Sequence, residues 1–200
     1  MADGENLEGI PYRAIVVGGS AGSFKPITNM LARIPQELPI PVFLCLHRLK
    51  HVRHGFVEAL SIRSNKKVSE PTDKEKIAPK RVYLAPANYH LALEPNNTVS
   101  LSTEPLVNNS RPAIDILFSS AAHAYGKGVL GILLSGANRD GAQGMRVIHQ
   151  LGGTTIVQDP DEATINAMPS AALAATEVDH VLKVEEIITF LERLHERRKV

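Results

Sequence analysis

Residues 14–22 read AIVVGGSAG, an apolar run that passes directly into a glycine-rich turn and then into a helical pattern. Strand, tight turn and helix in this order form the setting of the G-x-S-x-G motif, which presents a reactive serine at a strand end. Glycines allow the turn backbone angles that other residues resist. The stretch therefore predicts a βα unit with Ser20 at its turn. Two alternatives stay open on these residues alone, a phosphate-binding loop and a turn that only connects strand to helix.

Strand and helix patterns alternate along the rest of the chain, which favours an α/β fold of three layers (α/β/α) with a doubly wound, mainly parallel sheet. The apolar run at 129–134 is typical of a central parallel strand. Short strands at 81–85, 89–93 and 98–101 predict an antiparallel hairpin inserted at an edge. We expect further strands at 13–19, 41–47 and 154–158, and helices at 23–34, capped by Ser23, and at 53–64, 111–125, 141–151, 168–176 and 184–198.

Composition points to one soluble domain. The 200 residues are 44% hydrophobic, enough for one core, and no linker-like segment divides them. A net charge of +1 gives no bias toward nucleic acid or a membrane surface. The sequence contains no signal pattern and no apolar stretch long enough to cross a bilayer, so we expect a cytoplasmic protein without membrane insertion. The single cysteine, Cys45, lies in an apolar run and is expected to be buried.

Ser20, His47 and Asp140 each follow a predicted parallel strand. Because the carboxyl ends of parallel strands meet at one edge of a sheet, we expect the three side chains to come together. A serine hydroxyl needs a base to take its proton and a third group to orient that base. Each residue also has a simpler interpretation, since His47 could bind a backbone carbonyl and Asp140 could cap the helix that begins near Gly141. Their coincidence favours a triad for acyl transfer.

Several motifs, in this order along the chain, resemble those of the CheB-type chemotaxis protein-glutamate methylesterase catalytic domain. They are Gly18-Gly19-Ser20-Ala21-Gly22, Leu46-His47, Tyr83-Leu84-Ala85-Pro86 with His90, Arg111-Pro112-Ala113-Ile114-Asp115, Leu134-Ser135-Gly136, Asp140-Gly141-Ala142 with Gly144-Met145, and Met168-Pro169. The resemblance implies a catalytic domain at 13–183, between a short polar N-terminal segment at 1–12 and an amphipathic C-terminal helix at 184–200. It places the family's serine, histidine and aspartate on Ser20, His47 and Asp140.

The resemblance implies a reaction as well as a fold. Members of this family hydrolyse glutamate γ-methyl esters on the cytoplasmic helices of chemoreceptors to glutamate and methanol, and many deamidate receptor glutamines. In that scheme Ser20 attacks the ester carbonyl, His47 accepts its proton and Asp140 orients His47. The backbone amides of Ala21 and Ala137 are expected to bind the oxyanion. No cofactor and no metal ion are implied.

The chain departs from the family pattern in three loops. Arg48-Leu49 stands where Met-Pro is frequent, Ala137-Asn138 where Met-Gly is usual, and Ser23 where glycine is frequent. Asparagine tolerates left-handed backbone angles, so we expect Asn138 to preserve its turn. The best-known members carry an amino-terminal receiver domain, but only about a dozen residues precede the first strand here. We therefore expect a stand-alone enzyme, an enzyme regulated by a separate response regulator or signalling kinase, or an excised catalytic domain.

Other interpretations of the charged and polar residues stay open. The basic stretch at 48–54 could bind acidic receptor helices or be a solvated loop. His47 with His51 and His54 lacks a carboxylate or thiolate complement for zinc. Asp115 could pair with Arg111 or support the site. The alternative functions are a serine hydrolase for another substrate and a noncatalytic or nucleotide-binding module. A dinucleotide-binding domain usually has an acidic residue where His47 stands, which disfavours the last of these.

Overall fold

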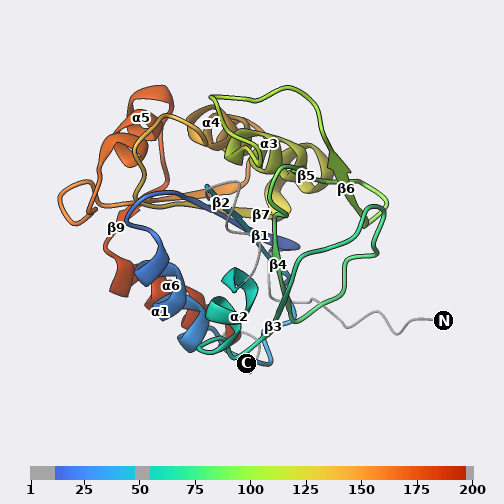
Figure 1. Ribbon diagram of the computed structural model, residues 1–200. Coiled ribbons are helices and arrows are strands. Elements are labelled where there is room, and N and C mark those ends of the chain that lie inside the picture. Colours follow the sequence, from blue (N-terminus) through green and yellow to red (C-terminus); the bar gives the residue numbers. More distant parts are fainter. Residues whose placement is uncertain (1–11, 48–54, 197–200) are drawn as a thin grey trace.

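A seven-stranded parallel sheet forms the middle layer of the computed structural model, which describes residues 12–47 and 55–196 (Figure 1). Its order is β3-β4-β2-β1-β7-β8-β9, so β2, β3 and β4 lie on one side of β1, and the later strands β7, β8 and β9 lie on the other. In such sheets functional groups gather at the carboxyl edge where the order reverses, here between β1 and β7. The strands are β1 (Ala14–Gly19), β2 (Val42–Leu46), β3 (Lys67–Ser69), β4 (Arg81–Leu84), β7 (Val129–Leu133), β8 (Thr154–Gln158) and β9 (His180–Leu182).

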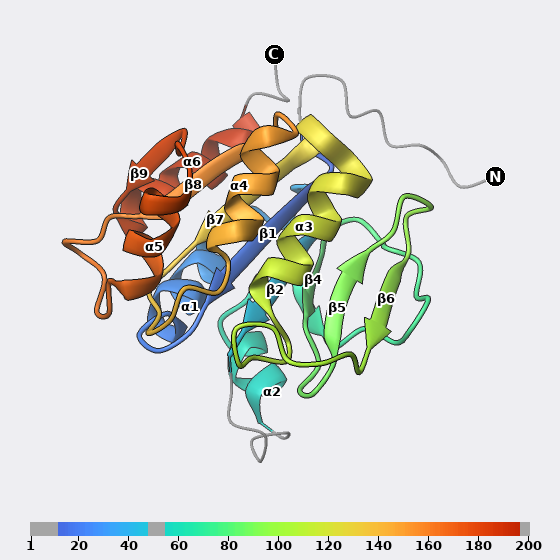
Figure 2. The ribbon, with the colours of Figure 1, turned by 90° about the horizontal axis from the view of Figure 1, so that it is seen from above.

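Helices cover both faces of the sheet, as the expected α/β/α layering requires (Figures 1 and 2). One face packs against α1, α2 and α6, and the other against α3, α4 and α5. No helix among the described residues is long and apolar enough to cross a membrane. The helices are α1 (Phe24–Arg33), α2 (Phe56–Ser61), α3 (Ile114–Tyr125), α4 (Ala142–Gln150), α5 (Ala167–Ala175) and α6 (Val184–Glu196), with a short 3-10 turn, η1 (Gly126–Gly128), between α3 and β7.

The central strands are apolar because both of their faces are covered. In β1, Ile15 and Val17 contact the core beneath α1 and α6, whereas Ala14 and Val16 contact the core beneath α3 and α4. Successive side chains of a strand point to opposite faces, so each central strand contributes side chains to both hydrophobic cores. Every residue of β1, β2 and β7 is buried, which explains why their sequences show no alternation of polar and apolar residues.

The antiparallel hairpin exists, but it is smaller than the sequence pattern predicted. It consists of β5 (His90–Leu93) and β6 (Val99–Ser102), which form a separate two-stranded sheet beside α3 (Figure 2). The expectation that residues 81–85 belong to this hairpin was wrong, because β4 pairs in parallel with β2 in the main sheet. Three consecutive buried residues in β4 mark a strand covered on both faces. The three-residue edge strands β3 and β9 were not predicted.

Two further expectations need correction or restriction. Ser23 stands at the N-cap position of α1, but its hydroxyl donates 2.7 Å to the carbonyl oxygen of Ser20 and caps no amide. Its backbone is already helical, which directs the side chain away from the first turn. Helix α2 is shorter than the expected 53–64, and residues 48–54 lie outside the described part of the chain. Cys45 is buried, as expected.

Gly144 allows α3 and α4 to lie side by side (Figure 2). A Cβ atom on this residue would lie 2.5 Å from Cβ of Phe118 and 3.3 Å from Cα of Asp115. We predict that Gly144→Ala lowers the free energy of unfolding by about 1–3 kcal/mol, the usual effect of overpacking, although alanine is the better helix former. Chemical denaturation measures this change. The exposed Gln143→Ala on the same helix is the control, and an equal or higher stability of Gly144→Ala would contradict the prediction.

Lys66 is a buried cation, only 5% exposed, directly before β3. Its ammonium group donates to the carbonyl oxygens of Gln36 and Leu38 at 2.8 and 2.7 Å. Burial lowers the pKa of Lys66 to about 8, from the ordinary value of 10.5. Between these two pH values the unfolded chain binds more protons than the folded protein, so folding gains stability as pH rises through this window.

We predict that the free energy of unfolding of the native protein rises by about 1–2 kcal/mol, relative to Lys66→Met, between pH 8 and pH 10. Chemical denaturation of both proteins at several pH values measures the difference. Comparison with Lys66→Met removes the contributions of all other titrating groups. A difference that stays constant or falls over this range would show that Lys66 keeps an ordinary pKa in the folded state.

Candidate active site

Ser20 lies in the turn that follows β1, and the end of β7 holds this turn in place. The amide of Ser20 donates 2.9 Å to the carbonyl oxygen of Ser135, and the Ser135 hydroxyl lies 2.9 Å from the carbonyl oxygen of Ala21. Gly22 has φ of +87°, and a Cβ there would lie 2.6 Å from the Ser135 hydroxyl. Only glycine meets both demands, which is why the turn is glycine-rich. These contacts therefore hold the turn, and Ser20 within it, in one position against the end of β7.

His47 follows β2, the strand directly beside β1. Its backbone amide donates 3.2 Å to the carbonyl oxygen of Gly19, so the two strand ends are tied together. The imidazole is 14% exposed and lines an open hollow of about 470 Å³ that Ser20 also lines. The aromatic rings of Phe24 and Phe56 meet edge to face at 5.3 Å and form an apolar wall of this hollow. The full lining is Ser20, Ala21, Gly22, Ser23, Phe24, Leu46, His47 and Phe56.

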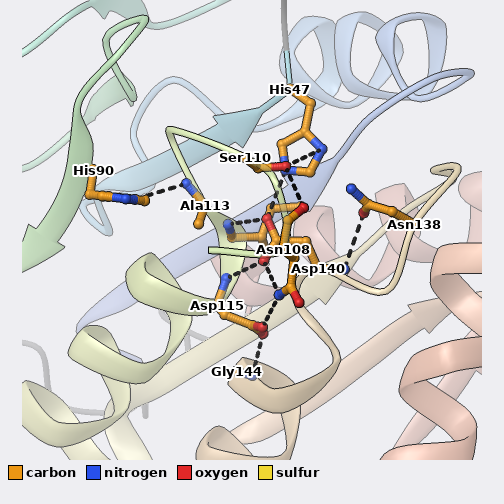
Figure 3. A network of polar contacts seen from close by, with 10 residues as sticks. His47, His90, Asn108, Ser110, Ala113, Asp115, Asn138, Asp140 and Gly144 are labelled. Atoms are coloured by element: carbon orange, nitrogen blue, oxygen red, sulfur yellow. Dashed lines mark hydrogen bonds and ion pairs between the residues drawn. The ribbon is translucent and has the colours of Figure 1, made fainter. Parts of the chain in front are cut away.

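Asp140 binds the imidazole of His47. Its Oδ2 atom lies 2.7 Å from Nε2 of His47, and its side chain is fully buried (Figure 3). An ionised carboxylate only accepts hydrogen bonds, so the proton of the neutral imidazole lies on Nε2 and Nδ1 is left as the acceptor. In the familiar serine protease arrangement the aspartate binds Nδ1 and the serine faces Nε2. This site uses the two ring nitrogens the other way round.

The Asp140 carboxylate receives four hydrogen bonds. In addition to His47, it accepts the backbone amides of Ile114 at 2.7 Å and Asp115 at 3.1 Å, and the side-chain amide of Asn108 at 3.2 Å. Burial by itself would raise the pKa of Asp140, but the hydrogen bonds from His47, Ile114 and Asp115 outweigh it and hold the pKa below its ordinary value. The carboxylate is therefore ionised at neutral pH.

Asp115, in the first turn of α3, is a second buried carboxylate that accepts hydrogen bonds beside Asp140. Its Oδ1 atom accepts the amide of Gly144 at 2.7 Å, in the first turn of α4, and its Oδ2 atom accepts Asn108 Nδ2 at 2.8 Å. Burial raises the pKa of Asp115 above its ordinary value. The expected pairing with Arg111 was wrong, because that guanidinium donates to the carbonyl oxygens of Thr103 and Glu104. Asp115 instead shares the Asn108 side chain with Asp140.

Asp140 does cap a helix, but the helix is α3 and not α4, the helix considered from the sequence. Asp140 directly precedes α4, yet it caps the first two amides of α3, while Asp115 in α3 caps α4. The amides at helix N-termini lack partners within their own helix, so each carboxylate satisfies the helix beside it. This exchange joins α3 and α4 at the site.

Asn108, which the sequence analysis missed, lies between the two carboxylates. It belongs to a tight turn in which Val107 and Ser110 exchange backbone hydrogen bonds of 3.2 and 2.9 Å. Asn108 and Asn109 have φ of 49° and 60°, the positive values that type I′ turns require. Asparagine is among the residues that tolerate these angles best. The Asn-Asn dipeptide was thus a turn signal that could have drawn attention to Asn108.

Two other polar residues fix the surroundings of Asp140. His90 is buried, and its ring accepts the amide of Ala113 at 3.2 Å and contacts the carbonyl oxygen of Pro105 at 3.0 Å, which anchors the start of α3. Asn138 does not adopt the left-handed conformation expected from the sequence. Its side-chain oxygen instead accepts the amide of Asp140 at 3.1 Å, and this bond shapes the loop.

Three other residues of the predicted site, Ser20, Ala21 and Ala137, have no hydrogen bond to the His47–Asp140 pair among the residues that the structure describes. Within the described residues no hydrogen bond joins the Ser20 hydroxyl to His47, whose Nδ1 lies 3.5 Å from the hydroxyl of Ser110. Ala21 lines the hollow, whereas Ala137 is exposed in the loop after β7 and is not part of the lining. Neither alanine amide has a hydrogen-bond partner in the described part of the chain, so both are available as donors. The basic stretch at 48–54 and the zinc alternative with His51 and His54 fall outside the described residues.

Comparison with known proteins gives a consistent family. A family profile described as CheB methylesterase matches residues 15–191. A Leptospira interrogans protein with the provisional name protein-glutamate methylesterase/protein-glutamine glutaminase is 41% identical over 183 residues, 92% of this chain and 95% of its own length. The protein-glutamate methylesterase FrzG of Myxococcus xanthus is 32% identical over 88% of this chain, which spans about half (53%) of that relative. The Thermotoga maritima CheB methylesterase catalytic domain superposes with a TM-score of 0.86 at 28% identity, over 92% of this chain and 98% of that one.

The hydrogen bonds to Asp140 lead to a stability prediction. Replacement by asparagine keeps the shape but presents an amide nitrogen to donors, so Asp140→Asn should lower the free energy of unfolding at pH 7 by about 2 kcal/mol. A carboxylate with a lowered folded pKa stabilises the protein above its unfolded pKa and loses this contribution as pH falls through the folded value. The difference between the two proteins should therefore shrink from pH 7 toward pH 3, as measured by denaturation. The exposed Asp161→Asn is the control, and a difference independent of pH would contradict the prediction.

Proposed function

Because this chain belongs to the CheB methylesterase family, we propose that it is a serine esterase that hydrolyses glutamate γ-methyl esters of chemoreceptor helices to glutamate and methanol. The observation that carries this proposal is the buried Asp140–His47 pair at a hollow that Ser20 also lines. A buried carboxylate that orients an imidazole beside a serine is the arrangement that activates a hydroxyl nucleophile. The same family names support a second activity, deamidation of receptor glutamines.

The reaction begins with proton transfer to Nδ1 of His47, the ring nitrogen that Asp140 leaves free. Ser20 Oγ forms a bond to the ester carbonyl carbon as its proton passes to His47, and the carbonyl oxygen becomes an oxyanion. The ester C–O bond then breaks, and methanol leaves with the proton from His47. Water attacks the acyl-enzyme in the same way, which releases glutamate and restores the Ser20 hydroxyl. With a glutamine substrate the leaving group is ammonia.

Oxyanion binding is assigned to the backbone amides of Ala21 and Ala137. The amide of Ser20 already donates to Ser135 and is not available, so the first donor is that of the residue after the nucleophile. Ala21 lines the hollow beside Ser20. Ala137 belongs to the loop that leads from β7 to Asp140, on the other side of the strand reversal. A pair of preorganised amides stabilises the charge that develops in the transition state.

The apolar wall of the hollow fits the non-reacting part of the substrate. Phe24 is 42% exposed, an unusual position for an aromatic ring, and it contacts Phe56. A glutamate methyl ester carries no charge and has two methylenes and a methyl group, which such a wall can cover. An ionised glutamate would lose hydration against the same wall, so the surface favours release of the product.

The proposed substrate sets the proposed location and partners. The methylated helices of chemoreceptors are cytoplasmic, so we place this enzyme in the cytoplasm, where a separate response regulator or signalling kinase would control it. Three residues at the carboxyl edge of the sheet, Ser20, His47 and Asp140, would be the catalytic triad. This assignment requires no metal ion and no cofactor.

The test is methanol release from methylated cytoplasmic fragments of chemoreceptors. We predict that Ser20→Ala and His47→Ala each lower the rate by about 1,000-fold or more. The exposed Ser170→Ala and His123→Ala are matched controls and should retain the native rate. Native protein that cleaves a small activated ester but no receptor fragment would indicate a serine hydrolase for another substrate. Folded native protein without either activity would contradict the proposal.

A further inference from the structure

We propose that Asn108 and Asp115 are positioning residues for this reaction, because Asp115, acting through Asn108, fixes the direction in which the Asp140 carboxylate faces His47 (Figure 3). The inference rests on the proposed function and extends it by two residues. Neither residue lines the hollow that contains Ser20 and His47, so neither touches a substrate bound there.

The two oxygens of Asp140 have different tasks. Oδ2 accepts His47 Nε2 and the amide of Ile114, both at 2.7 Å. Oδ1 accepts the Asn108 side chain at 3.2 Å and the amide of Asp115 at 3.1 Å. Rotation of the carboxylate about its terminal torsion moves both oxygens together. The bonds to Oδ1 therefore hold Oδ2 in line with the imidazole.

Asp115 holds the Asn108 amide nitrogen in place beside Asp140. The oxygen and nitrogen ends of an asparagine side chain have almost the same shape, so hydrogen-bond partners determine their orientation. Asn108 Nδ2 lies 2.8 Å from Asp115 Oδ2 and 3.2 Å from Asp140 Oδ1, and its two hydrogens serve one carboxylate each. The ionised Asp140 accepts only, so the nitrogen end of Asn108 faces it, and the same nitrogen donates to Asp115. Without Asp115 the Asn108 amide loses the shorter of its two hydrogen bonds, and its nitrogen is no longer held beside Oδ1 of Asp140.

Helix capping alone does not explain Asp115. One oxygen, Oδ1, accepts the amide of Gly144 in the first turn of α4, which is the contact that caps this helix. The other oxygen, Oδ2, accepts Asn108, and this contact places a second buried carboxylate close to Asp140. Two like charges in a buried site destabilise each other. Such an arrangement is typical of sites selected for function, in contrast to those selected for stability alone.

Asp115→Asn separates the two roles. The new side chain keeps its Oδ1 for the amide of Gly144, so the cap of α4 survives, but its nitrogen faces the nitrogen of Asn108. The Asn108 amide then loses its shorter hydrogen bond, and its nitrogen is no longer held beside Oδ1 of Asp140. We expect kcat for methyl ester hydrolysis to fall about 10-fold, with KM unchanged, the size of one lost charge-assisted hydrogen bond.

Asn108→Gly removes the relay and preserves the turn. Glycine accepts the φ of 49° that Asn108 adopts, so the loop keeps its conformation. We expect the same fall in kcat as for Asp115→Asn, and no further fall in the double variant, because both changes break one chain of contacts. Asn109→Gly is the matched control, since it has a φ of 60° in the same turn and should keep the native kcat.

A second readout does not depend on the substrate. Nitrogen NMR of the His47 ring reports which nitrogen carries the proton, and the native protein should show the Nε2–H form that Asp140 selects. Asp115→Asn and Asn108→Gly should each show a mixture with the Nδ1–H form, whereas Asn109→Gly should not. An inactive native protein with this tautomer pattern would contradict the proposed function and leave the positioning role supported. Native kcat and an unchanged tautomer in both Asp115→Asn and Asn108→Gly would overturn it.

Discussion

The exchange of caps between α3 and α4 is the constraint on which the site depends. Asp140 accepts the first amides of α3, and Asp115 in α3 accepts an amide in the first turn of α4. Helix N-termini carry partial positive charge, and two of them meet here. They offset the cost of burying two carboxylates, so the ionised Asp140 that His47 requires can exist in the core. The Asp140 carboxylate that caps α3 is therefore the same group that binds the imidazole of His47.

Sequence reasoning located the site because strand ends are easy to find. Apolar runs predicted β1, β2 and β7, and the rule that parallel strands end at one edge brought Ser20, His47 and Asp140 to the same part of the sheet. The structure joins His47 to Asp140 directly and places Ser20 on the same hollow as His47. These expectations succeed because they depend on the chain's own local pattern and on one general property of parallel sheets.

What sequence reasoning missed depends on partners that are distant along the chain. Sequence shows partners that are near along the chain more readily than partners on a neighbouring helix. The α4 cap considered as the alternative role of Asp140, and the pairing with Arg111 considered for Asp115, were both partners of this nearby kind. Residues 81–84 looked like part of a hairpin because the short strands that follow them do form one, and only the parallel pairing with β2 reveals their place. Asn108 carries no chemistry that a pattern would single out. Its importance follows from the two acids on either side of it.

The pairing register of β1 and β2 sets how the active site meets a large substrate. Gly19 lies opposite Leu46, so the serine and the histidine that follow them start from adjacent positions on one sheet edge, tied by a backbone hydrogen bond. Because Asp140 holds Nε2, the nitrogen left for Ser20 in the proposed reaction is Nδ1, the one nearer the main chain of His47. The atoms that would react, Ser20 Oγ and His47 Nδ1, therefore lie close to the backbone at the open edge of the hollow, in contrast to a deep pocket. In the proposed reaction a side chain can reach this edge while it still projects from an intact helix, so the proposed substrate helix needs no local unfolding.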